Sequence, residues 1–335
     1  AHYPCDQEFA KAAMEKGLML WLEIPLTGST STDPLFLENC KSQLIEMIEQ
    51  HYNNPAVIIW GIGNESDRSG GGEAVSNKVF AELVKTAKQL DVTRSVTGCN
   101  YKYKSNQDLV EIYAPQDWSG WYSGVISDYK PKEIIGEYGA DIDFDIRTNK
   151  SFDIEKNYSA AGKPEFWSQE YGALLHEYKV SIGLAYQDSF PGHFAWVAFD
   201  FASPRIDRRS NPIPFMNQKG LIKHDHKTKK DVYYMYQSMY RKASEFPMLY
   251  IVPGSWVNNP EDAKNTSIWA YSNCDSVLLF NGAIAYPLGA RIKNAGPKGN
   301  TRFQWDNVEI TTDKIIAEAW FNNQIVVRDT VIIKK

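Results

Sequence analysis

The sequence predicts an α/β fold built on parallel strands, followed by a smaller antiparallel β domain. Short apolar runs alternate with helical patterns up to about residue 244, and this alternation is typical of a parallel sheet. From about residue 247 the pattern changes to short alternating strands with Asn-Gly and Asn-Asn turns, which is typical of an antiparallel sandwich. A chain of 335 residues suits two such domains.

The composition narrows the class of partner. The net charge of −5, without a long basic patch, argues against nucleic acid and against an anionic membrane surface, and no apolar run is long enough to span a membrane. Aromatic residues make up 13% of the chain, which suits stacking on sugar faces, although core packing explains such rings equally well. The four cysteines show no C-x-x-C spacing, so they are expected to be buried free thiols, with neither a zinc site nor a disulfide framework.

The central stretch of the chain is an apolar run, Val57 to Ile62, that ends in Gly63, Asn64 and Glu65. Such a run predicts a buried parallel strand, whose last residues project where other strands also end. A lone glutamate after a strand more often caps a helix or pairs with a lysine, so the motif alone does not assign a role to Glu65.

The longer segment from His51 to Glu65 resembles the acid/base segment of glycoside hydrolase family 2, which includes β-galactosidases, β-glucuronidases and β-mannosidases. The resemblance implies a (β/α)8 barrel that hydrolyses β-glycosides with retention of configuration. It makes Glu65 the acid/base, and it makes Asn64 the residue that holds the sugar 2-hydroxyl.

The beginning of the chain matches the same family at two places. His2-Tyr3-Pro4 resembles the segment after the second barrel strand, and Glu23-Ile24-Pro25 resembles the end of the third. This implies that His2 binds substrate, and that the first strand, most of the second and two β domains are missing from the sequence. We therefore expect a fragment that folds poorly alone, because its sheet edges would lack partners.

The elements around the central strand follow from periodicity. A helix should pack one apolar face with Cys40, Leu44, Met47 and Ile48. The expected elements that follow are a polar rim loop at 67–73, without the lysine of a phosphate loop, a helix at 74–89, and strands at 91–98 and 108–113.

Two stretches compete for the second catalytic acid, since both read Glu-Tyr-Gly-Ala. Residues 132–141, which contain Glu137, resemble the family's nucleophile strand. Glu170 lies instead in a pattern at 164–186 that predicts an amphipathic helix, on which a glutamate usually faces solvent. Glu137 is therefore the expected nucleophile.

Further substrate-binding candidates come from the resemblance. Gly120-Trp121-Tyr122 matches the family, but Gln116 and Trp118 stand where members commonly have Asn-x-Tyr, which leaves the sugar preference open. The match makes Tyr122 a substrate-binding candidate, and the position of Trp118 at the place of the family's tyrosine makes it another.

The expected eighth strand, 193–201, carries Trp196, either a sugar platform or a core residue, and Asp200, either a partner to the site or a structural acid. Asn217 and Lys219 match an Asn-x-Lys-Gly that binds the uronate in β-glucuronidases, but β-galactosidases share it. His224-Asp225-His226 lies among lysines and predicts a solvated loop rather than a metal site. A last barrel helix is expected at 231–240.

Together these matches predict an N-terminally truncated barrel over residues 1–244 and an immunoglobulin-like sandwich over 245–335. The favoured function is a retaining, exo-acting β-galactosidase without cofactor or metal, acting on an oligosaccharide or a polysaccharide-derived β-glycoside. The alternatives are a β-glucuronidase, a hydrolase of a modified galactoside, and a catalytically silent carbohydrate-binding barrel. Two intact acids argue against the silent barrel, and homo-oligomerisation stays open.

Overall fold

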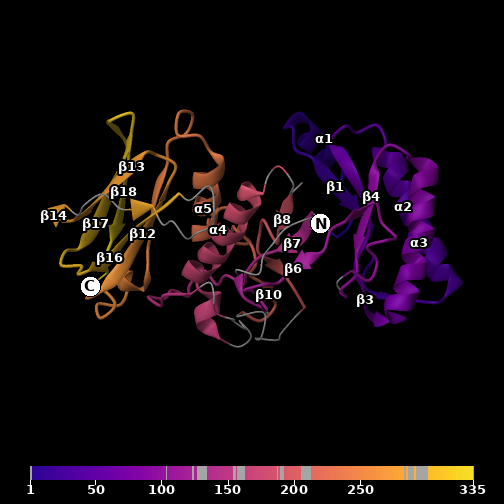
Figure 1. Cartoon of the computed structure of the whole chain (residues 1–335), viewed down its shortest axis with the longest axis horizontal. Helices are drawn as coiled ribbons and strands as arrows, with labels where there is room; N and C mark the ends of the chain where they lie inside the picture. Colours follow the sequence, from indigo (N-terminus) through magenta and orange to yellow (C-terminus); the bar gives the residue numbers. More distant parts are fainter. Residues whose placement is uncertain are drawn as a thin grey trace. The chain divides into compact units, whose positions relative to one another are not determined.

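The structure is a computed structural model that describes residues 2–102, 104–122, 124–126, 134–153, 156, 163–186, 188, 192–204, 213–282, 284–285, 290–291 and 301–334 (Figure 1). It divides into two compact units. The first comprises Ala1–Asp117, Lys132–Glu137 and Phe190–His193, and the second Trp118–Pro131, Tyr138–Ser189 and Phe194–Lys335. The expected domain boundary between residues 244 and 245 stays a prediction.

The first unit is built on a parallel sheet in the order β1-β3-β4-β5, with β2 also paired to β3. The strands are β1 (Leu20–Glu23), β2 (Thr27–Thr30), β3 (Val57–Gly70), β4 (Ser95–Cys99) and β5 (Ile112–Tyr113). The helices are α1 (Gln7–Glu15), α2 (Pro34–His51) and α3 (Gly72–Leu90), of which α2 and α3 lie side by side along one face of the sheet (Figure 1). The predicted parallel α/β arrangement is confirmed here.

The core of this unit lies between the sheet and those two helices. It includes Leu44 and Met47 of α2, Phe80 and Leu83 of α3, and Trp60 of β3. The inward faces predicted from periodicity are therefore correct.

Two expectations for the first unit are wrong. Residues 67–70 continue β3 instead of forming a loop, because Ser69 and Gly70 pair with Ser29 and Thr30 of β2. The strand expected at 108–113 is reduced to Ile112–Tyr113, and it is preceded by turns.

A second sheet has the order β6-β7-β8, with β6 (Gln116–Asp117), β7 (Ile135–Tyr138) and β8 (His193–Ala195). Within the first unit, Ile135 N donates to Gly192 O at 3.1 Å and Gly136 N to Pro115 O at 2.8 Å. The predicted short strand at the nucleophile segment is present as β7, whereas Lys132 and Glu133 lie outside the described residues.

In the second unit the pattern at 164–186 becomes a short 3-10 helix, η2 (Pro164–Trp167), and then α4 (Gln169–Ala185), which packs against α5 (Asp231–Tyr240). The expectation of an amphipathic helix is wrong, because α4 is buried on nearly all sides. Some of its polar residues have partners far away in the sequence: Glu177 accepts from Tyr271 and Arg302, and the His176 ring lies 2.8 Å from the Tyr236 hydroxyl.

The expected eighth strand is also interrupted. β8 ends at Ala195, and residues 197–200 form backbone hydrogen bonds with residues 219–222 instead. Short strands β9 (Phe201–Ala202) and β10 (Met216–Asn217) then pair with each other. The competing partner segment explains why one continuous apolar pattern does not give one strand.

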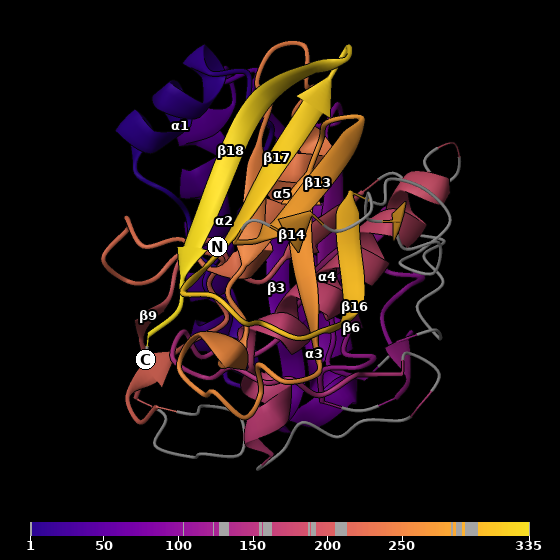
Figure 2. The same ribbon diagram turned by 90° about the vertical axis from the view of Figure 1, so that its left-hand side faces the viewer.

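Two antiparallel four-stranded sheets complete the second unit, in the orders β11-β12-β16-β15 and β14-β13-β17-β18. Their strands are β11 (Leu249–Val252), β12 (Thr266–Ser272), β13 (Ser276–Asn281), β14 (Ile284–Ala285), β15 (Ala290–Arg291), β16 (Arg302–Val308), β17 (Lys314–Phe321) and β18 (Gln324–Ile332), with the turn η3 (Ser255–Val257) after β11. Figure 2 shows β13, β17 and β18 side by side. Residues of both sheets share one apolar core, which includes Ile268 and Ile315. Strands were predicted at 267–271, 276–280, 302–305, 315–320 and 325–333, and they are present as β12, β13, β16, β17 and β18, whereas β11, β14 and β15 were not predicted.

The cysteines are free thiols, of which Cys40, Cys99 and Cys274 are buried and Cys5 is half-buried. Among the described residues, none of the helices combines the length and apolarity that crossing a membrane requires.

Candidate active site

The part of β3 just before Glu65 owes its shape to two glycines. A Cβ at Gly61 would lie 2.4 Å from Trp21 Nε1 and 2.7 Å from Glu23 Cβ, so only glycine lets those side chains cross the strand here. Gly63 has a φ of 152°, a conformation that favours glycine. Glu65 itself has a φ of 51°, which is uncommon for a residue with a side chain and marks a backbone held by its surroundings.

A cluster of polar side chains gathers in the first unit around His2. The His2 Nδ1 lies 3.0 Å from Glu23 Oε1, and its Nε2 lies 3.8 Å from Glu137 Oε2 and 3.4 Å from Asn64 Nδ2. Gln116 in turn donates from Nε2 to Asn64 Oδ1 at 2.5 Å. Three residues predicted from sequence, namely His2, Asn64 and Glu137, thus meet through one imidazole.

The charge state of this cluster follows from its burial and its carboxylates. Burial alone would lower the pKa of His2, but the carboxylates of Glu137 and Glu23 outweigh it and raise the pKa to about 9. His2 is therefore a cation at neutral pH. This cation lies 3.0 Å from Glu23 Oε1 and 3.8 Å from Glu137 Oε2.

The Glu65 carboxyl tends to keep its proton, because its pKa is raised. Burial raises its pKa above the ordinary value and the nearby charge of Glu137 adds to the rise, while Arg68 and His2 lower it. One carboxyl that tends to hold a proton beside another that is paired with a cation matches the demand of acid/base catalysis.

Arg68 is a member of the site that sequence reasoning missed. Its Nη1 donates to Glu65 Oε2 at 2.6 Å, and its guanidinium lies over the Tyr101 ring, 4.9 Å from the centroid. No local pattern pointed to Arg68, because residues 67–70 were expected to form a loop. Their strand conformation depends on pairing with β2. Glu23 was also missed as a site residue, although its Glu-x-Pro segment had been noted.

Asn217 and Lys219 lie together in the second unit, where the Asn217 side chain accepts from Lys219 N at 3.2 Å. The Lys219 ammonium is 2% exposed and lies 2.8 Å from Asp141 Oδ1. Trp121 donates from its indole to the other oxygen of Asp141 at 3.0 Å. Burial raises the pKa of Asp141, and Lys219 opposes the rise.

The three aromatic candidates also belong to the second unit. Trp118, Tyr122 and Trp196 are partly buried and pack against the same apolar cluster, and Tyr122 stacks on Trp121 with centroids 4.6 Å apart. Trp196 meets Phe201 edge to face at 6.0 Å. Both interpretations of Trp196, the sugar platform and the core residue, stay open because it is neither fully buried nor fully exposed.

Asp200 is a structural acid in the second unit. It accepts from Lys230 Nζ at 2.7 Å and from Gly220 N at 2.8 Å, and the same ammonium donates to Ile142 O and Gln218 O. Lys230 is fully buried. This network ties the Asn-x-Lys-Gly segment to α5.

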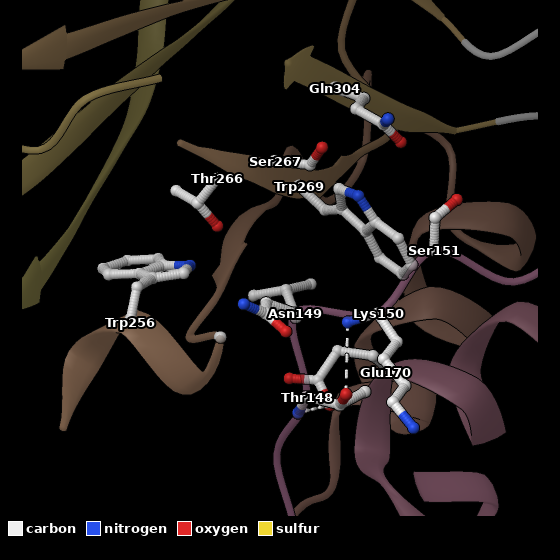
Figure 3. A pocket seen from close by; sticks show the side chains of 12 residues that line it. Thr148, Asn149, Lys150, Ser151, Glu170, Trp256, Thr266, Ser267, Trp269 and Gln304 are labelled. Atoms are coloured by element: carbon white, nitrogen blue, oxygen red, sulfur yellow. Dashed lines mark hydrogen bonds between the residues drawn. The ribbon is translucent and has the colours of Figure 1, made fainter. Parts of the chain in front are cut away.

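Glu170 does not face solvent, contrary to expectation. It lies in the first turn of α4, 5% exposed, where it accepts from Thr148 N at 3.1 Å and lies 3.5 Å from the Arg147 guanidinium. Figure 3 shows it at the base of a pocket lined also by Lys150, Trp256 and Trp269. Burial raises its pKa to about 7 despite the arginine.

Within the described ranges, no group of three or more His, Cys, Asp or Glu side chains could hold a metal ion. At His224-Asp225-His226, the Asp225 carboxylate accepts from Lys227 N and Thr228 N at 2.9 and 2.8 Å. The segment is an exposed turn, in agreement with its interpretation as a solvated loop.

Comparison with known proteins points to the family that the sequence motifs indicated. Residues 1–244 match the family model described as "Glycosyl hydrolases family 2, TIM barrel domain". The chain is 32% identical over 312 residues to a Formosa agariphila protein named "Putative beta-glucuronidase", which covers 84% of this chain and 36% of that protein. It is 31% identical over 272 residues to a Bacteroides fragilis "Beta-glucuronidase", covering 75% of this chain and 37% of that protein. The chain therefore spans little more than a third of the length of these two relatives.

Solved structures extend the likeness over nearly the whole chain. A Bacteroides uniformis "beta-glucuronidase 3" superposes with a TM-score of 0.80 at 29% identity, covering 99% of this chain and 43% of that one. A "putative beta-galactosidase" from Bacteroides fragilis superposes with a TM-score of 0.82 at 26% identity, covering 99% of this chain and 48% of that one.

Proposed function

The chain belongs to glycosyl hydrolases family 2, with its TIM barrel domain over residues 1–244, and we propose that it carries the catalytic centre of a retaining β-glycosidase. The observation that carries the proposal is a cluster in which the His2 imidazole lies 3.8 Å from the Glu137 carboxylate. The charges of both groups also act on the pKa of Glu65. The family resemblance seen in the sequence is confirmed, whereas the roles of individual residues are part of this proposal.

In the proposed reaction, Glu137 attacks the anomeric carbon while Glu65 gives its proton to the glycosidic oxygen. The C–O bond to the leaving sugar breaks, and a glycosyl ester of Glu137 forms. Glu65 then takes a proton from water, whose oxygen attacks the anomeric carbon and releases Glu137. His2 positions the Glu137 carboxylate before attack, and Asn64, fixed by Gln116, is oriented for the sugar 2-hydroxyl.

For the sugar itself we propose a β-glucuronide rather than the β-galactoside that the sequence had favoured. The two curated relatives and one of the two solved structures are named as β-glucuronidases, and these names support the proposal. The motif at Asn217 and Lys219 suits a uronate but does not by itself choose between the two sugars, because β-galactosidases share it. Lys219 already has a carboxylate partner in Asp141, so a sugar carboxylate has to share or replace it. The raised pKa of Asp141 makes its protonation easier when a second carboxylate arrives.

The β-galactosidase alternative retains one specific support, the name of the Bacteroides fragilis structure. The departure of Gln116 and Trp118 from the family's usual Asn-x-Tyr supports neither sugar. For residues 245–335, we propose the immunoglobulin-like domain that the sequence predicted, supported by two antiparallel sheets that share a core.

A panel of 4-nitrophenyl β-glycosides tests the proposal. We expect the glucuronide to be hydrolysed at least about tenfold faster than the galactoside in kcat/KM, which corresponds to about 1.4 kcal/mol. The first product seen by proton NMR should be the β anomer. An α product would contradict the retaining mechanism, and a faster galactoside would restore the original preference.

A further inference from the structure

Arg68 is the starting point, because its position beside Glu65 is at odds with the role proposed for Glu65. A general acid has to hold a proton, yet an arginine hydrogen-bonded to a carboxylate stabilises the ionised form. The Arg68 Nη1 lies 2.6 Å from Glu65 Oε2, a short charge-assisted bond. Something has to weaken this bond when the proton is needed.

The role of Glu65 as an acid indicates which part of the substrate lies near Arg68. Glu65 would protonate the glycosidic oxygen, and this oxygen leaves with the departing sugar. A group bonded to the Glu65 carboxylate from the exposed side therefore borders the leaving sugar. The Arg68 side chain is 46% exposed, while that of Glu65 is 13% exposed, so the arginine is on the solvent side of the pair.

The Arg68 guanidinium packs on an aromatic ring, and its contacts with protein leave hydrogen-bond donors available for another acceptor. It lies over the Tyr101 ring. The Asp67 carboxylate holds the backbone of this segment, because it accepts from Tyr101 N at 2.5 Å and from Lys102 N at 3.2 Å. In the part of the chain that the structure describes, Glu65 is the one acceptor of its hydrogen bonds. A guanidinium has five N–H donors, so a second acceptor with two oxygens can be bound in its plane.

We propose that Arg68 recognises an anionic group, a carboxylate or a sulfate ester, on the sugar that leaves, and that it turns from Glu65 to this group when substrate binds. The inference rests on the proposed glycosidase function. It differs from the motif at Asn217 and Lys219, which concerns the sugar that is transferred to the enzyme.

The exchange of partners fits both halves of the reaction. With the substrate anion bound to Arg68, Glu65 loses a cation and takes up a proton from the solvent, and it then gives this proton to the glycosidic oxygen. When the anionic sugar has left, Arg68 can pair again with the Glu65 carboxylate, which now has to be ionised to take a proton from water. The other charged groups that act on Glu65 are Glu137 of β7 and His2, and the Cys99 thiol of β4 is also near. None of these is expected to exchange partners.

The test compares three disaccharides that share the best glycone from the chromogenic panel and differ only in the leaving hexose. One hexose is neutral, one carries a 6-carboxylate and one a 6-sulfate. We expect the enzyme to favour at least one anionic leaving sugar about 10- to 100-fold in kcat/KM, the range of a charged hydrogen bond. The two anionic substrates distinguish carboxylate from sulfate.

Variants then assign the preference to Arg68. Arg68→Gln should remove most of the preference, with a smaller loss on the neutral substrate, and Arg68→Lys should restore part of it. The alkaline limb of kcat/KM should move to higher pH in Arg68→Gln, because Glu65 has lost a cation. Arg328→Gln, which breaks the 2.8 Å ion pair between Arg328 of β18 and Glu318 of β17, is the matched control and should leave both readouts unchanged.

Equal rates on all three disaccharides, or equal losses on all three in Arg68→Gln without a shift of the alkaline limb, would overturn the role of Arg68 and leave the glycosidase intact. Failure to hydrolyse any aryl β-glycoside would instead remove the proposed function itself, and this inference with it.

Discussion

The same four residues, Glu-Tyr-Gly-Ala, occur at 137–140 and at 170–173, and the two copies have different surroundings. In the first, Glu137 lies in the short strand β7, 3.8 Å from the His2 imidazole. In the second, Glu170 opens a helix that is buried on nearly all sides and lies 3.5 Å from Arg147. The secondary-structure element that carries a glutamate, rather than the residues next to it in the sequence, therefore decides which partners the glutamate contacts.

The largest effect should separate the two glutamates directly. We expect Glu137→Ala to lower kcat by at least about 10⁴-fold, because it removes the proposed nucleophile. Glu170→Ala should keep most of the activity per folded molecule. Steady-state rates on the preferred aryl glycoside measure both, with circular dichroism to confirm folding. A reversed result, in which Glu170 is the essential residue, would exchange the roles of the two copies.

Glu65 is also carried by a strand, β3, and should share the catalytic importance of Glu137. Glu65→Ala should slow substrates with poor leaving groups by about 10²- to 10⁴-fold and activated aryl glycosides much less, since only the former need a proton. Azide should restore part of the rate on activated substrates by replacing water, which the variant no longer activates. Uniform losses without azide rescue would argue against the acid/base role.

For Glu170 we expect an effect on stability instead of catalysis. Its pKa rises from 4.5 to about 7 on folding, so the folded state holds this proton over a range in which the unfolded state has released it. Stability should therefore fall as pH rises from about 4.5 to 7, by about 3 kcal/mol in total. Glu170→Gln should flatten this slope in urea titrations at several pH values. An unchanged slope would show that another group is responsible.

The smallest effect is expected at Trp118. Trp118→Tyr introduces the hydroxyl that family members commonly carry at this place. We expect relative rates across the glycoside panel to change more than the melting temperature, because Trp118 is only partly buried against its cluster. Unchanged relative rates would mean that this side chain does not contact the sugar.

Local sequence patterns predicted much of the fold. The apolar run before Glu65, the helix at 74–89 and the helix at 231–240 each carry enough periodicity to identify the element, and all three are present as β3, α3 and α5. The Glu65 and Glu137 segments were identified by family motifs that follow short apolar runs. In each case the signal lies in a few consecutive residues.

The errors arose where long-range pairing decides the outcome. The continuation of β3 to Gly70 depends on β2, a four-residue segment that offers no strong pattern of its own, and Arg68 was missed for that reason. The burial of α4 depends on partners such as Arg302, which lies 125 residues from Glu177. A helical period reveals which positions share a face, but it does not reveal which faces other segments cover.

The extended β3 has a consequence for engineering. Residues beyond barrel strands are often exchanged as specificity loops, because little else depends on them. Here the backbone after Glu65 is the pairing partner of β2, and Asn64 N also donates to Leu26 O at 2.9 Å. A graft of residues 66–70 from a relative would unpair that edge strand. Libraries aimed at the leaving-group side should therefore vary side chains on this ribbon at constant length.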